Sequence, residues 1–179
     1  MRVITGTARG RKLRTLEGDD IVRPTTDRVK EAMFSIVQFE LQDAKVLDLF
    51  AGSGQLGIEA LSRGADNAVF VDKNIEAFET VKENLKLTGL YQKSTVLNAD
   101  SVSYIKNSKL KFDIVIIDPP YNKGLTQEVL PYAANCCNDT ATIICETDFN
   151  EELPEKAGDF IKYKEYKYSK TKLTTYKHG

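Results

Sequence analysis

Three glycines, Gly52, Gly54 and Gly57, form a G-x-G-x-x-G pattern within residues 48–57. Glycines at this spacing, between a strand and a helix, let the backbone approach a ligand closely. Asp72 follows 20 residues after Gly52, where an acidic side chain binds the ribose hydroxyls of a nucleotide cofactor. The pattern predicts a nucleotide-type cofactor, and on its own it also permits the dinucleotide of an oxidoreductase.

A second candidate site is Asp118-Pro119-Pro120-Tyr121, which ends an apolar run at residues 112–117. Its two prolines stiffen the turn and remove two backbone donors, which leaves carbonyls and the Asp118 carboxylate as acceptors. Tyr121 offers a flat ring on which a nucleobase stacks. Acceptors around an exocyclic amine help to localise its lone pair, and a carboxylate stabilises positive charge that develops on the nitrogen or accepts a proton. These residues predict chemistry on a base amine.

Asp48 stands at the entrance of the glycine loop and bears on the choice of cofactor. A carboxylate there would repel a pyrophosphate but attract the ammonium or sulfonium group of S-adenosylmethionine. The acids lie singly at the ends of separate strands, and three cysteines with one histidine are too few for a zinc site. The residues therefore favour S-adenosylmethionine and no metal.

Short apolar runs alternate with helical patterns from residue 45 onward, which predicts an α/β fold. We expect a mostly parallel seven-stranded sheet with helices on both faces. Parallel strands end at one edge, so Asp48, Asp72, Asp100 and Asp118 would meet in one crevice. The expected strands are 45–50, 68–71, 94–97, 112–117, 141–145, 160–168 and 172–177, and the expected helices between them are 55–63, 74–87, a short one after residue 100, and 125–137.

The 179 residues suit one domain with a short appendage. Residues 1–16 predict a small hairpin with a turn at 6–10, and a helix is expected to open after Arg23-Pro24, capped at 25–27. We therefore expect a basic N-terminal appendage over residues 1–22 and the main domain over residues 23–179.

Charge is unevenly distributed along the chain. The net charge is −1, yet residues 1–30 hold eight basic and four acidic residues, and residues 160–179 hold six lysines and one glutamate. Basic segments on an acidic body favour contact with a polyanion such as RNA. The candidate phosphate contacts are a basic cluster, defined as Arg9, Arg11, Lys12 and Arg14, together with Arg23 and Arg28.

These motifs resemble the class I S-adenosylmethionine-dependent methyltransferases, and Asp118–Tyr121 is similar to the [DN]-P-P-[YFW] signature of enzymes that methylate exocyclic amines. The resemblance to the RsmD family is closer, because three separated blocks agree in order. These blocks are Met1–Gly6 with Arg9–Leu13, Arg23–Glu31, and Asp48–Ala65. Gln55 departs from the small residue common at its position, and Ser169–Lys172 lacks a glycine that other members often have.

The resemblance implies a Rossmann-like methyltransferase fold and a role for each matched residue. The residues implied to bind the cofactor are Asp48, Phe50, Ala51, Gly52, Ser53, Gly54, Asp72, Lys73, Ala99, Asp100 and Asp118. The loop from Asp48 would cradle the methionine part, Asp72 would hold the ribose, and Asp100 with the backbone of Ala99 would meet the adenine. Asp118, Pro119, Pro120 and Tyr121 would form the catalytic loop around the target base.

The resemblance also implies a bacterial 16S ribosomal RNA guanine-N2 methyltransferase that acts on RNA within a small-subunit assembly particle. Three alternatives stay open: an adenine-N6 methyltransferase of DNA or RNA, a nicotinamide-dependent oxidoreductase, and an assembly factor without catalysis. The intact Asp118–Tyr121 loop argues against the last. We expect a cytoplasmic monomer without membrane contact, because no apolar run approaches the roughly 18 residues of a membrane span.

Overall fold

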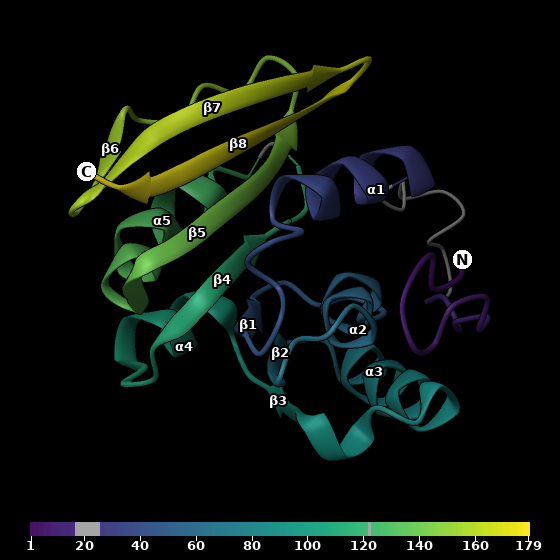
Figure 1. Cartoon of the computed structure of the whole chain (residues 1–179). Coiled ribbons are helices and arrows are strands. Elements are labelled where there is room, and N and C mark those ends of the chain that lie inside the picture. Colours follow the sequence, from purple (N-terminus) through teal and green to yellow (C-terminus); the bar gives the residue numbers. More distant parts are fainter. Residues whose placement is uncertain (17–25, 122) are drawn as a thin grey trace.

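The computed structural model describes residues 1–16, 26–121 and 123–179 (Figure 1). Its strands form one eight-stranded sheet in the order β3-β2-β1-β4-β5-β8-β7-β6. Pairing is parallel from β3 through β5 and antiparallel from β5 through β6. The strands are β1 (Lys45–Asp48), β2 (Asn67–Asp72), β3 (Ser94–Asn98), β4 (Phe112–Ile117), β5 (Cys137–Asp148), β6 (Lys156–Ala157), β7 (Phe160–Tyr168) and β8 (Thr171–His178).

The α/β class, the mostly parallel sheet and the helices on both faces are confirmed, but the count of seven strands is wrong. The additional strand is β6, whose two residues pair with Ile161 and Phe160 at the edge of the sheet. Two residues are too few to show the alternation by which a strand is recognised in sequence. Strand β5 is also longer than the predicted 141–145, because its polar ends pair as well as its apolar centre.

The helices cover the two faces of the sheet and bury an apolar core on each (Figure 1). Helices α1, α2 and α3 pack on one face, around Phe34, Leu56 and Phe70. Helices α4 and α5 pack on the other, around Ile105 and Leu130. The helices are α1 (Asp27–Ile36), α2 (Gln55–Ser62), α3 (Ile75–Thr88), α4 (Ser101–Asn107) and α5 (Leu125–Asn135), with a short 3-10 turn η1 (Tyr91–Lys93).

Local capping fixes where several helices begin and end. The Thr26 hydroxyl accepts a hydrogen bond from the Val29 amide at 3.3 Å, which satisfies a donor in the first turn of α1. Asn74 caps α3 in the same way, and Gly89 ends that helix with a φ of 75°. None of the described helices is long and apolar enough to cross a bilayer.

The predicted hairpin over residues 1–16 forms only in part. Arg2 and Lys12 make a single antiparallel bridge, with no named strand on either side. The reason is that the next amides bond to a side chain instead: Ile4 and Thr5 donate to the Glu59 carboxylate of α2, at 2.8 and 2.9 Å. The N-terminal segment is thus attached to α2, and the division of the chain at residue 22 falls outside the described residues.

A buried ion pair supports this attachment. The Lys30 ammonium of α1 lies 3.5 Å from Glu59 Oε2, both side chains are fully buried, and Lys30 also donates to the Arg2 carbonyl at 2.7 Å. Burial lowers the pKa of Lys30, and the Glu59 carboxylate opposes this effect. One carboxylate therefore joins the N-terminal segment, α1 and α2.

Candidate active site

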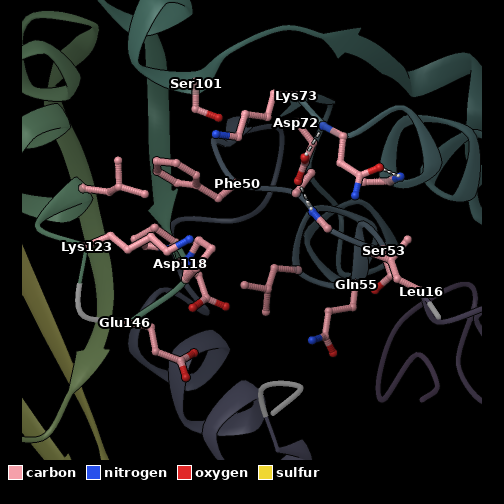
Figure 2. A pocket seen from close by; sticks show the side chains of 18 of the residues that line it. Leu16, Phe50, Ser53, Gln55, Asp72, Lys73, Ser101, Asp118, Lys123 and Glu146 are labelled. Atoms are coloured by element: carbon pink, nitrogen blue, oxygen red, sulfur yellow. Dashed lines mark hydrogen bonds between the residues drawn. The ribbon is translucent and has the colours of Figure 1, made fainter. Parts of the chain in front are cut away.

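A cavity of about 430 Å³ opens at the carboxyl ends of the parallel strands (Figure 2). Its volume lies in the range of roughly 300–1,000 Å³ that is usual for ligand pockets. The structure brings together in its wall most of the residues predicted as site residues. These are Phe50, Ala51, Gly52, Ser53, Asp72, Lys73, Asp100, Asp118, Pro119, Pro120 and Tyr121. Asp48, Gly54 and Ala99 are not part of the lining.

The glycine loop presents bare backbone to the cavity. Gly52 has a φ of 53°, and a Cβ atom added there would meet no protein atom within 4 Å, so a side chain would occupy open space on the ligand side. Gly57 has a different role, because a Cβ atom on it would overlap the Phe70 ring of β2. One glycine thus leaves room for a ligand, and the other permits close packing of helix on sheet.

Asp72 joins the end of β2 to the glycine loop. Its Oδ2 accepts from the Gly52 amide and its Oδ1 from the Asn74 amide, both at 2.9 Å (Figure 2). Each carboxylate oxygen can accept a further hydrogen bond, so Asp72 keeps acceptor capacity at the cavity wall. The residue predicted to hold a ribose therefore also orders the loop beside it.

Asp48 lies under the glycine loop and not in the cavity wall. It is 1% exposed, and its Oδ2 accepts from the Gly57 amide at 2.9 Å. Its Oδ1 is buried without a hydrogen-bond partner in the described part of the chain. Burial raises the pKa of Asp48 from 3.8 to about 7 against the Gly57 hydrogen bond, and nearby Asp72 adds to the rise. This placement differs from the expectation that its carboxylate faces the cofactor directly.

Asp100 and Lys73 lie at the end of the cavity formed by β2 and β3. Asp100 caps α4, where it accepts from the Ser103 amide at 2.9 Å. That hydrogen bond lowers the pKa of Asp100, and the charge of Lys73 lowers it further. Figure 2 shows Lys73 and Ser101 on this side of the cavity. Ala99 supplies a backbone amide that bonds to the Asp72 carbonyl at 3.1 Å, which ties the two strand ends together.

The catalytic loop predicted at Asp118–Tyr121 forms the opposite side of the cavity. Its last residue is held by two strands: the Tyr121 hydroxyl donates to Glu146 of β5 at 2.8 Å and lies 3.1 Å from the Thr171 hydroxyl of β8. Burial and the adjacent Glu146 carboxylate raise the pKa of Tyr121, so the phenol keeps its proton. The ring is fixed at its far end, which suits a surface for stacking.

Sequence reasoning missed several residues of the wall, above all Gln55 and Glu146. Gln55 begins α2, is 8% exposed, and its Oε1 has no hydrogen-bond partner among the described residues. Glu146 is the acidic residue that directly follows the apolar run of β5, so the rule that selected the other strand ends was sufficient to find it. Met1, Leu16 and Lys123 also line the cavity, which brings the N-terminal segment to its rim.

The residues predicted to bind RNA differ in their surroundings. All four members of the basic cluster are exposed, and one of them, Arg14, forms a 2.8 Å ion pair with Glu83. Arg28 is exposed on α1, whereas Arg23 lies outside the described residues. In the basic C-terminal segment, Lys172 is 1% exposed and pairs with Glu152 and Glu165, so it is not available to phosphate.

Metal ligands are not gathered anywhere in the described ranges: no group of three or more His, Cys, Asp or Glu side chains is placed to hold an ion. The three cysteines, Cys136, Cys137 and Cys145, are buried free thiols. The chemistry available in the cavity is therefore that of carboxylates, an amide, a phenol and backbone groups.

Comparisons with known proteins agree with this architecture. A family model described as "Conserved hypothetical protein 95" matches residues 1–177. YlbH of Bacillus subtilis strain 168 is 37% identical, over 99% of this chain and 98% of its own. Ribosomal RNA small subunit methyltransferase D of Escherichia coli K12 is 34% identical, over 92% of this chain and 83% of its own. The solved structure of yhhF from Escherichia coli has a TM-score of 0.88 and 32% identity, and covers 99% of this chain and 97% of that one. The resemblance noted in the sequence is confirmed, and the chain belongs to the RsmD family.

Proposed function

We propose that this protein transfers a methyl group from S-adenosylmethionine to the exocyclic N2 amine of a guanine in small-subunit ribosomal RNA. Methylation of ribosomal RNA is supported by the relatives of the family, one of which is named for that activity. The observation that carries the proposal is that a single cavity joins the glycine loop and Asp72 to the Asp118–Tyr121 loop. A cofactor and a base can therefore meet within it.

The wall near the glycine loop fits S-adenosylmethionine. Gly52 leaves space for the ligand, Asp72 has acceptor capacity for ribose hydroxyls, and the orphaned Gln55 Oε1 offers an acceptor to an ammonium group. When bound, the cofactor supplies an electrophilic methyl group attached to a sulfonium. Asp48 would act from beneath, by holding the Gly57 amide and adding negative charge behind the loop.

The opposite wall suits an amine. Guanine N2 is nearly non-basic, and bond formation to the methyl carbon builds positive charge on that nitrogen before a proton leaves. The Asp118 carboxylate, held next to a proline-stiffened turn, stabilises that charge or accepts the proton. Tyr121 provides the stacking face.

RNA would be held outside the cavity by phosphate contacts of the basic cluster and Arg28, with Arg23 as a further candidate. Such contacts position a substrate without reading its sequence. We place the protein in the cytoplasm as a monomer that acts on a small-subunit assembly particle.

The test is methyl transfer from labelled S-adenosylmethionine to naked 16S RNA and to small subunits from cells that lack this protein, followed by nucleoside analysis. We expect N2-methylguanosine, whereas N6-methyladenosine would select the adenine alternative. Under single-turnover conditions Asp118→Ala should lower the rate by on the order of 100-fold or more at near-normal cofactor affinity. A wild-type rate in that variant would refute the catalytic assignment. Calorimetry with a nicotinamide dinucleotide tests the oxidoreductase alternative.

A further inference from the structure

Glu146 lies beside Asp118 in the cavity although its role is not explained by the proposed chemistry. In the parallel pairing of β4 with β5, Ile117 is opposite Cys145, so the next residues of the two chains, Asp118 and Glu146, are neighbours. Adjacent strands are about 4.8 Å apart, and residues at equivalent positions project to the same side of a sheet. Figure 2 shows both carboxylates turned into the same part of the cavity.

The Glu146 side chain is held in place and nearly enclosed. Glu146 is 3% exposed, and its Oε1 accepts the Tyr121 hydroxyl at 2.8 Å. Burying a carboxylate costs much more than burying an amide or an apolar group, so a residue needed only to anchor a tyrosine has no need of this charge. A carboxylate at the wall does suit a ligand that brings hydrogen-bond donors.

We propose that Glu146 selects guanine by accepting the N1–H of the target base, while Asp118 accepts from the N2 amine. This inference rests on the proposed function. Guanine carries two adjacent donor groups on its Watson–Crick edge, N1–H and N2–H₂, which match two adjacent carboxylates. Each carboxylate oxygen has two lone pairs, so Glu146 can serve the base while it continues to hold Tyr121.

The same arrangement rejects adenine. Adenine has one amine on this edge, next to the unprotonated ring nitrogen N1, and a carboxylate facing that lone pair gains no hydrogen bond and is repelled. A site whose buried polar groups are left unpaired discriminates more strongly than one that differs only in shape. Glu146 is thus a specificity-determining residue, and Asp118 acts on the amine that either base offers.

The test compares guanine with 2-aminopurine at the target position of a synthetic RNA that carries the methylated guanine with its flanking sequence. 2-Aminopurine keeps the N2 amine but has an unprotonated N1. The wild-type protein should prefer guanine by about 100-fold or more in single-turnover rate. Glu146→Gln keeps an acceptor for Tyr121 and gains an amide donor for N1 of the analogue. Its preference for guanine should therefore fall by at least about tenfold.

Tyr121→Phe is the matched control. It breaks the 2.8 Å hydrogen bond but retains the Glu146 carboxylate, so it should slow methylation of both bases and leave their ratio unchanged. Cofactor affinity and thermal unfolding of each variant show whether the pocket is intact. A wild-type ratio near one overturns the inference even if Glu146→Gln does not fold.

The two proposals fail in different ways. If the wild-type protein forms no N2-methylguanosine in any RNA, the proposed function is wrong. If it does so and Glu146→Gln keeps the wild-type ratio of guanine to 2-aminopurine, only the role of Glu146 is wrong. If Tyr121→Phe changes that ratio as much as Glu146→Gln does, Glu146 acts only through the position of the tyrosine, which also overturns the inference.

Discussion

Replacing Asp48 with asparagine should change how the stability of the protein depends on pH. Burial raises the pKa of Asp48 from 3.8 to about 7, so between these values the folded chain binds a proton that the unfolded chain does not. Stability from this group is therefore fully present below pH 3.8 and is lost as pH rises to 7. At about 1.4 kcal/mol per pH unit between the two values, the ionised carboxylate costs the folded state about 4 kcal/mol.

The asparagine side chain would keep an oxygen for the Gly57 amide but would place an unpaired amide nitrogen at the site of the orphaned Oδ1. That nitrogen costs about 1–3 kcal/mol at every pH. Asp48→Asn should thus be less stable than wild type near pH 4 and gain about 4 kcal/mol relative to it by pH 8. Urea unfolding at five pH values between 4 and 8 measures this difference, and Asp139→Asn, at an exposed position, controls for the removal of a charge. A difference between Asp48→Asn and wild type that does not vary with pH would falsify the buried-charge argument.

The other predictions concern the cofactor, the RNA and the N-terminal segment. Asp72→Ala should weaken binding of S-adenosylmethionine by about 1–3 kcal/mol in calorimetry, and unchanged affinity would remove Asp72 from the cofactor site. Replacing the basic cluster with alanines should make RNA affinity less dependent on salt, by a little under 1 in the logarithmic slope for each phosphate no longer bound, with cofactor affinity unaltered; an unaltered slope contradicts this. Glu59→Ala leaves Lys30 buried without its carboxylate, so the free energy of unfolding should fall by about 3–5 kcal/mol in urea titration; a decrease below about 1 kcal/mol, as for a typical surface pair, would contradict that.

The parallel half of the fold was largely predictable because its signals are local. Each apolar run from β1 to β4 is short, is followed by a glycine or an acid, and lies within two residues of its predicted bounds. Helix caps at Thr26 and Asn74 are equally local. Strand β6 and the polar ends of β5 were missed because they depend on pairing with β7 and β8, and a pairing partner leaves no mark on the segment itself.

The side-chain partners in the site were harder to predict than its location. Strand ends alone placed Asp72, Asp100 and Asp118 in one cavity, since carboxyl ends of parallel strands meet at one edge. They did not reveal that Asp48 turns under the loop toward Gly57, because orientation depends on which amide is nearest once α2 is packed. The attachment of residues 4 and 5 to Glu59 was invisible for a similar reason: the donor and acceptor are more than 50 positions apart.

The two sides of the cavity are built in different ways, and this bears on how each can change. The cofactor side is ordered by contacts of short sequence separation, from Asp72 to Gly52 and Asn74 and from Asp100 to Ser103. The base side is ordered by contacts from Tyr121 to Glu146 and Thr171, 25 and 50 residues apart, across strands that include the antiparallel edge of the sheet. Because these sets share no residue, substitutions in β5 and β8 can alter base selection without disturbing cofactor binding. Identity of the base can therefore be changed on a cofactor site that stays constant.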